Sequence, residues 1–185
     1  MDNGASSYRR FLDGDESGFV EIVRDYKDGL ILYLNTFTNN IHTAEDLAED
    51  TFVKLGIKKP KDKGTSLFKT WLYTIGRNIA IDYLRKQKSV CHIPINNFAD
   101  LSADEDFIET SYLKEEQKIH LHKALKNLKP EYMQVLYLTY FENFNNKQTA
   151  KIMKKSVHNI ETLLYRARKS LKSELLKEGF VYEKL

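Results

Sequence analysis

The 185-residue chain contains one cysteine, three prolines and no long apolar run. The lone Cys91 excludes an intramolecular disulfide framework and is typical of proteins in reducing compartments. The longest purely apolar run, Leu30–Leu34, is far shorter than the roughly 20 residues of a membrane-spanning helix. The first residues include Asp2, Asp13 and Asp15 and lack the basic-then-apolar order of a signal peptide. We therefore expect a soluble, cytoplasmic protein.

Side chains that could build a catalytic or metal site are also scarce. His120 and His122 are two residues apart, so they do not share a helix face and make a poor metal pair. Cys91 and His92 lack further ligands at zinc spacing, and no glycine-rich phosphate-binding loop occurs. We expect no catalysis, no metal, no cofactor and no small-molecule substrate.

Charge is present in quantity and is segregated along the chain. Residues 13–50 hold ten acids against two bases, a net charge of −8, and residues 54–88 hold ten bases against two acids, a net charge of +8. Residues 99–116 carry −6 and residues 145–177 carry +7. Two basic blocks separated by an acidic one indicate two contacts with a polyanion such as nucleic acid. The alternative is that solvated surface charges cluster by chance.

Apolar residues recur at helical spacing, and no convincing alternating segment predicts a strand, so we expect an all-α fold. The composition, 42% hydrophobic, is sufficient for a packed core. One predicted helix face begins at Phe19 and ends at Leu30. A second helix is predicted to start at Thr43, with Asp46 as capping-box partner, and to end at Gly56. A third runs from about residue 66 to residue 88.

The pattern breaks at residues 89–111, which form a polar, acidic stretch typical of a linker. Helices resume near Tyr112, and Pro130 is placed to open the next helix at its first turn. Residues 133–141 are apolar nearly all round, which predicts a central, buried helix.

The last two predicted helices, 146–155 and 156–176, have the form of a helix-turn-helix. Ser156 can cap the longer one, which buries a stripe from Val157 to Leu171 and exposes a basic face. Such a helix fits the major groove of DNA, where side chains near its start meet base edges. The alternative is a helical hairpin that packs on another protein. The candidate DNA-contacting residues are His158, Glu161, Thr162, Tyr165, Arg166, Lys169 and Lys172.

Residues 146–153 and 156–171, ending in Arg166-Ala-Arg168-Lys169, resemble the C-terminal promoter-reading domain of bacterial sigma factors. The family usually has glycine at the turn position that Lys154 occupies. Either a lysine adopts positive φ there, at a cost of about 1 kcal/mol, or the turn differs. Glu161 stands where the family often has a basic residue, so the base preference cannot be transferred. A glutamate side chain repels phosphate but can accept a hydrogen bond from a cytosine amino group.

Residues 66–88 resemble the sigma-factor helix that opens and reads the −10 promoter element, and Ala44–Phe52 resemble the preceding helix that binds the polymerase clamp. The two-domain form resembles the extracytoplasmic-function (ECF) subfamily. The resemblance implies region 2 at residues 5–90, a flexible acidic linker at 91–111 and region 4 at 112–178. Family linkers thread through the polymerase active-site cleft. The alternative is that residues 91–111 form an inert tether, which would let the two domains move independently.

The predicted helix at residues 66–88 carries an aromatic side chain, an amide and surrounding basic residues. One stripe of this helix contains Trp71, Asn78, Asp82 and Arg85. Such side chains could hold a flipped base and anchor phosphates. Trp71 could instead belong to the core, and Asp82 could merely pair with Arg85 or Lys86 along the helix. The candidate −10 contacts are Lys58, Lys59, Lys61, Lys63, Trp71, Arg77, Asn78, Asp82, Arg85 and Lys86.

The resemblance implies that Asp46, Leu47, Glu49 and Asp50 bind polymerase, since acidic residues here meet a basic coiled coil in the family. The alternative is an ordinary solvated face. The implied partners are core RNA polymerase, promoter DNA and an anti-sigma factor. A stand-alone helix-turn-helix regulator is the alternative function, although it would need neither the acidic face nor the 57–88 basic block. A helical adaptor that binds only protein leaves both basic blocks unexplained.

Overall fold

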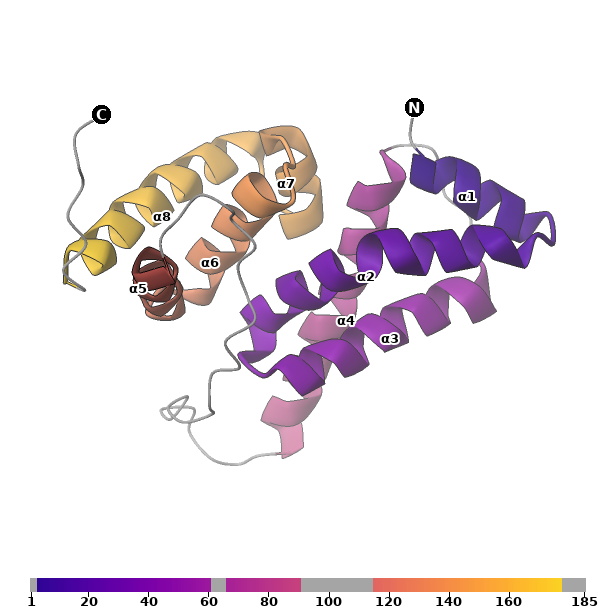
Figure 1. The fold of residues 1–185 in the computed structure, drawn as a ribbon, viewed down its shortest axis with the longest axis horizontal. Coiled ribbons are helices and arrows are strands. Elements are labelled where there is room, and N and C mark those ends of the chain that lie inside the picture. The colour runs from indigo at the N-terminus through magenta and orange to yellow at the C-terminus, as the bar shows by residue number, and fades with distance from the viewer. Residues whose placement is uncertain (1–2, 61–65, 91–114, 178–185) are drawn as a thin grey trace.

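The computed structural model describes residues 3–60, 66–90 and 115–177, and every regular element in these ranges is helical. The N-terminal group comprises α1 (Asn3–Leu12), α2 (Glu16–Thr38), α3 (Ile41–Lys58) and α4 (Phe68–Val90). The C-terminal group comprises α5 (Glu115–Lys126), α6 (Pro130–Leu136), a π-helical segment η1 (Tyr137–Phe141), α7 (Asn146–Met153) and α8 (Val157–Lys177). Figure 1 shows the two groups side by side. The all-α prediction is confirmed, and no described helix is long and apolar enough to cross a membrane.

The core of the N-terminal group lies where α2, α3 and α4 meet. Leu30 and Leu34 of α2, Leu55 of α3 and Leu72 of α4 have 0% exposure. Each such side chain contributes about 1.5–3 kcal/mol through its removal from water. Helix α1, which the sequence patterns did not predict, packs across α2. The contact is so close at Gly18 that an added Cβ would lie 2.2 Å from the Ser7 carbonyl oxygen.

The ends of α3 differ from the predicted ends. The helix begins at Ile41, because the Asn40 side chain accepts from the Thr43 amide at 3.0 Å and acts as the N-cap in place of Thr43. Gly56 lies inside the helix, which continues to Lys58. The C-cap is Lys59, a non-glycine residue at φ 40°. An isolated glycine is tolerated inside a helix, so Gly56 was a weak stop signal.

The C-terminal group packs α5, α6 and α7 against α8. Ile152, Ile160 and Ala167 are fully buried at its centre. Pro130 stands at the first turn of α6, as predicted. The chain does not continue as one buried α-helix to residue 141. It changes to the π-helical η1, and Tyr140 and Phe141 are 54% and 38% exposed.

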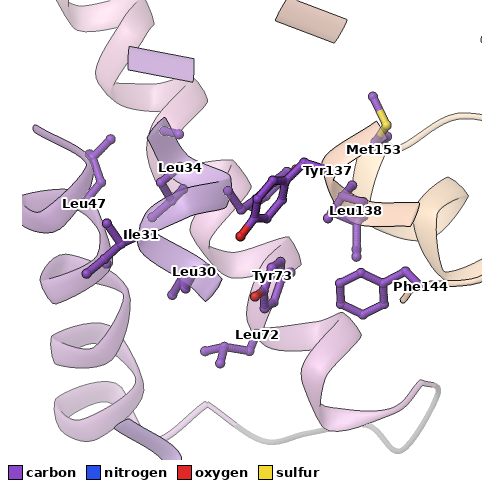
Figure 2. Packing of buried hydrophobic residues seen from close by; sticks show 14 of the residues in the cluster. Leu30, Ile31, Leu34, Leu47, Leu72, Tyr73, Tyr137, Leu138, Phe144 and Met153 are labelled. Atoms are coloured by element: carbon purple, nitrogen blue, oxygen red, sulfur yellow. The ribbon is translucent and has the colours of Figure 1, made fainter. Parts of the chain in front are cut away.

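The two groups of helices are in direct contact. Helix α7 contacts α4, and α6 contacts α2. The buried apolar residues of both groups form one continuous cluster. Figure 2 shows this junction, where Tyr73 of α4 lies among Tyr137, Leu138 and Phe144 of the other group. The relative placement of the groups therefore involves side-chain packing as well as the connecting chain, whose residues 91–114 lie outside the described part.

Candidate nucleic-acid interface

Helices α7 and α8 form the predicted helix-turn-helix. A capping box starts α7, in which the Asn145 side chain accepts from the Gln148 amide at 3.0 Å and the Gln148 side chain accepts from the Asn145 amide at 2.8 Å. Ser156 Oγ accepts from the Asn159 amide at 3.1 Å and caps α8 as predicted. Between the helices, Lys154 adopts the left-handed conformation, with φ 54°. The turn thus keeps the geometry that favours glycine, at a cost of about 1 kcal/mol.

The two faces of α8 are chemically distinct. Ile160, Leu164 and Ala167 are buried, whereas Val157, predicted to be buried, is 37% exposed because it opens the helix. Tyr165 is 65% exposed. An exposed aromatic among basic residues is unusual for a merely solvated face. The predicted contacts that lie on the exposed side are His158, Glu161, Tyr165, Arg166, Lys169 and Lys172, with Thr162 partly buried beside them.

Helix α4 places the second set of predicted contacts along one side. Asp82 and Arg85 are exposed and form an ion pair at 3.6 Å. This pairing along the helix is the alternative that the sequence offered to a DNA contact by Asp82. Arg77 and Asn78 are partly buried, and Lys86 is exposed. Residues of the helix-turn-helix face this stripe. The resulting cleft, of about 530 Å³, is lined by Arg77, Asn78, Ile81, Asp82, Arg85, Met153, Lys154 and Lys155.

Trp71 lies apart from this cleft. Its ring packs 5.4 Å from the Tyr8 ring and 5.7 Å from the Phe68 ring, centroid to centroid, and the residue is partly buried. This environment favours a packing role. A stacking role for the remaining exposed part stays a prediction.

The basic loop before α4 is described only at its start. Lys58 and Lys59 are exposed, and Lys59 Nζ lies 4.6 Å from the centroid of the Phe11 ring, a cation–π contact. Lys61 and Lys63 lie outside the described residues. Phe11 of α1 thus contacts the start of this loop. The sequence did not reveal this contact, because periodicity within one helix does not show which other segment packs against it.

The candidate polymerase-binding face lies on α3. Asp46, Glu49 and Asp50 are exposed, whereas Leu47 is only 3% exposed and forms the floor of a groove. Sequence reasoning missed two exposed aliphatic residues on the same side, Val53 and Ile57, at 53% and 77% exposure. Residues 46, 50, 53 and 57 are spaced as one helix stripe. The sequence signal that could have identified Val53 and Ile57 is that these apolar residues lie outside the buried stripe of α3.

Two family models match the chain. The Sigma-70 region 2 model matches residues 22–90, and the Sigma-70 region 4 model matches residues 119–171. The first covers most of α2 and all of α3 and α4, and the second covers most of the C-terminal group. The two candidate DNA-contacting helices therefore lie one in each matched region.

Curated relatives extend along nearly the whole chain. RNA polymerase sigma factor YlaC of Bacillus subtilis is 31% identical over 164 residues, which are 85% of this chain and 91% of the relative. ECF RNA polymerase sigma factor SigM of the same organism is 31% identical over 153 residues, 83% of this chain and 92% of the relative.

Solved structures share the fold. The sigma factor RpoE of Bartonella quintana, in complex with the anti-sigma factor NepR, aligns with a TM-score of 0.66 at 24% identity, covering 86% of this chain and 96% of that chain. CnrH, in complex with the cytosolic domain of CnrY, aligns with a TM-score of 0.64 at 20% identity, covering 95% and 96%. With its two sigma regions, its relatives and its helix-turn-helix, the chain belongs to the RNA polymerase sigma factors of the ECF group.

Proposed function

We propose that this sigma factor divides promoter recognition between its two groups of helices. Helix α8 reads the −35 element, α4 contacts and opens the −10 element, and α3 holds the chain on core RNA polymerase. The observation that carries this proposal is the exposed basic face of α8, positioned by a capped helix-turn-helix. The polymerase carries out the chemistry, and this chain acts with it in the cytoplasm as a non-catalytic specificity subunit.

Contacts on α8 serve two different purposes in this proposal. Arg166 and Lys169 neutralise phosphates, which positions the helix without selecting a sequence. Glu161, one turn inside the helix start, is placed to accept from a base edge, and a carboxylate there selects cytosine. The −35 sequence preferred by this chain therefore differs from that of relatives with a basic residue at this position.

The α3 stripe supports the assignment of the polymerase contact. Its first half is acidic, with Asp46 and Asp50, and its second half is apolar, with Val53 and Ile57. A partner with basic side chains beside an apolar ridge would complement both halves. Charge complementarity would steer the encounter, and the aliphatic side chains would add buried apolar area.

Binding to purified sigma-free core polymerase tests this proposal, with size exclusion as the readout. We expect the wild-type chain to co-elute with core and Asp46→Arg with Asp50→Arg to separate from it. Single variants permit a matched comparison, because Asp50→Arg and Asp28→Arg change the charge equally, while exposed Asp28 lies on α2, away from the stripe. Loss of binding in both single variants would indicate a general charge effect. No co-elution of the wild type, with core that binds another sigma normally, would favour the stand-alone regulator.

We also propose that an anti-sigma factor controls this chain. One solved structure of the same fold is the sigma factor RpoE in complex with the anti-sigma factor NepR. The test is competition, in which a candidate anti-sigma protein is added to the preformed complex of this chain with core polymerase. Release of the chain supports the proposal, and an unchanged complex at saturating candidate contradicts it for that candidate.

A further inference from the structure

Positive side chains from both groups of helices gather in one cleft. The cleft encloses about 530 Å³, within the range of small-ligand sites, roughly 300–1,000 Å³. Arg77 and Arg85 of α4 line one wall, and Lys154 and Lys155 of the helix-turn-helix line the other. Asp82 is the only acid among the lining residues. Four cations therefore share the cleft with one carboxylate, and its interior favours anions.

Two of these four cations already have an acidic partner. Arg85 lies 3.6 Å from Asp82, and the two side chains are 77% and 66% exposed. Lys155 Nζ lies 3.2 Å from Glu131 Oε1, and the Glu131 side chain is 60% exposed. Ion pairs that are this exposed to water are weak. A ligand with several negative charges could therefore compete with both carboxylates.

The other two cations, Arg77 and Lys154, have no ion-pair partner among the described residues. Arg77 is partly buried, and its Nε has no hydrogen-bond acceptor in the described part of the chain. A buried donor without an acceptor disfavours the folded state. A guanidinium presents its N–H donors in a planar fork that matches phosphate oxygens. Arg77 thus brings unused donors to the edge of the cleft.

Packing elsewhere in the contact holds these like charges near one another. Lys69 Nζ of α4 lies 2.7 Å from Glu142 Oε2 and donates to the Glu142 main-chain carbonyl at 3.0 Å. The Tyr73 ring meets the Phe144 ring edge-on at 5.1 Å. Lys69 therefore has its own acid at the contact, whereas the cations of the cleft outnumber theirs. Their mutual repulsion is relieved when an anion lies between them.

The remaining lining residues suit the other parts of a nucleotide. Asn78 is partly buried, and its amide can both donate and accept hydrogen bonds. Ile81 of α4 and Met153 of α7 add apolar surface, and a methionine side chain adapts easily to a flat ring. An amide beside apolar side chains can bind the edge and the face of a base. The cleft thus combines cations for phosphates with a surface for a base.

We propose that this cleft binds a compact polyphosphate, whose phosphates bridge Arg77 of α4 and Lys154 of the helix-turn-helix. The polyphosphate could be the triphosphate of a nucleotide or an inorganic chain, because both present the same linked phosphates. Several linked phosphates fit better than a single one, since the cations come from two separate elements. The inference goes beyond the proposed function, because it concerns a small ligand of the chain without polymerase or promoter.

The proposed ligand and promoter DNA would use some of the same side chains. Arg77, Asn78 and Arg85 line the cleft and are also predicted −10 contacts. Lys154 belongs to the turn of the helix-turn-helix and is not among the predicted −35 contacts. A requirement for Lys154 therefore distinguishes the small-ligand site from DNA binding by α4 alone.

Isothermal titration calorimetry of the full-length chain tests the proposal, with sodium tripolyphosphate and ATP as the two probes. Arg77→Gln and Lys154→Glu each change one wall of the cleft. Lys147→Glu is the matched control, because Lys147 is an exposed lysine of α7 that does not line the cleft. Circular dichroism verifies that the variants fold. If Arg77→Gln does not fold, Arg85→Gln replaces it, because the Arg85 side chain is 77% exposed.

We expect one tripolyphosphate to bind per chain. Arg77→Gln and Lys154→Glu should each weaken binding roughly tenfold or more, because each loses charge-assisted hydrogen bonds to phosphate. Lys147→Glu should change the affinity by no more than about twofold, as expected for a distant charge screened by salt. Tighter binding of ATP than of tripolyphosphate would identify a nucleotide as the ligand, since the base adds contacts. Equal or weaker binding of ATP would identify the inorganic chain.

Three results would overturn the proposal. If neither probe binds, the cleft is not a polyphosphate site. If all three variants weaken binding equally, the effect is one of general charge. If only one of the two cleft variants weakens binding, or two ligands bind per chain, the phosphates do not bridge the two walls. Each of these results leaves the sigma function intact, because the titration contains no polymerase, and failure to bind core polymerase would leave the polyphosphate site intact.

Discussion

The Tyr8 hydroxyl donates to the Pro60 carbonyl at 2.7 Å and ties α1 to the start of the basic loop that precedes α4. The two residues are 52 positions apart in the sequence. Tyr8 is 2% exposed, so its ring is part of the core while its hydroxyl bonds to the start of the loop. The position of the loop start thus depends on the N-terminal helix.

Tyr8→Phe removes this hydrogen bond and keeps the ring. We expect a loss of about 0.5–1.5 kcal/mol in the free energy of unfolding, the usual net contribution of one hydrogen bond. Urea unfolding followed by circular dichroism measures it. Tyr140→Phe is the control, because Tyr140 is 54% exposed and its hydroxyl can bond to water. Equal losses in both variants would show that the Pro60 contact is not responsible.

Lys154→Gly should stabilise the protein, because glycine adopts positive φ without the steric cost that lysine has there. We expect a gain of up to about 1 kcal/mol, visible as a higher thermal midpoint. Lys154→Ala distinguishes the backbone effect from the charge effect, because it removes the charged amine but keeps the steric cost of positive φ. A gain of the same size in the alanine variant would assign the effect to charge repulsion in the cleft instead.

Lys169→Ala and Glu161→Ala should change promoter binding in different ways. Loss of the Lys169 phosphate contact should weaken binding to all sequences and lower the salt-dependence slope by about one unit. Loss of Glu161 should leave the slope nearly unchanged and relax the base preference at one position, by about 1–3 kcal/mol of discrimination. Binding of the polymerase complex to a promoter library at several salt concentrations measures both. Identical behaviour of the two variants would contradict the division of roles on α8.

The pH dependence of stability should carry a contribution from Glu21. A hydrogen bond from Arg10, and a second from Ser7, hold the pKa of Glu21 below its ordinary value of 4.5. A lowered carboxyl pKa stabilises the folded state above the unfolded-state pKa, and this contribution is lost as pH falls through the folded pKa. Wild type should therefore exceed Glu21→Gln in stability near neutral pH, and the difference should shrink below about pH 4.5. Urea unfolding at a series of pH values measures it, and a difference independent of pH would contradict the assignment.

Periodicity predicted most of the fold because its signals are local. The apolar spacing of α3 and α8 identified most of the residues that pack inward, with Val157 of α8 as an exception. Pro130 and Ser156 mark helix starts by their own backbone and side-chain chemistry. The failures are also physical. Thr43 and Asn40 can both cap a helix, and only the path of the chain from α2 decides that Asn40 does so.

The candidate site was predictable where a residue's role depends on its own helix. The outward positions of α8 followed from the buried stripe opposite them. Helical spacing within α3 places Val53 and Ile57 off the buried stripe, but only the packing of α3 against α4 shows that these two apolar side chains line a groove. The packing environment of Trp71 likewise depends on Tyr8, which lies on a separate helix.

By itself, the sequence determined most of the helices, the segregation of charge and the helix-turn-helix, because these follow from spacing within about 20 residues. Only the tertiary structure decided how the two sigma regions meet. Lys69 and Glu142 are 73 positions apart, and nothing in the periodicity around either residue indicates its partner. Gly29 of α2, aromatic rings from both groups and the π-turn at Glu142 pack around these two side chains, of which Glu142 is 10% and Lys69 33% exposed.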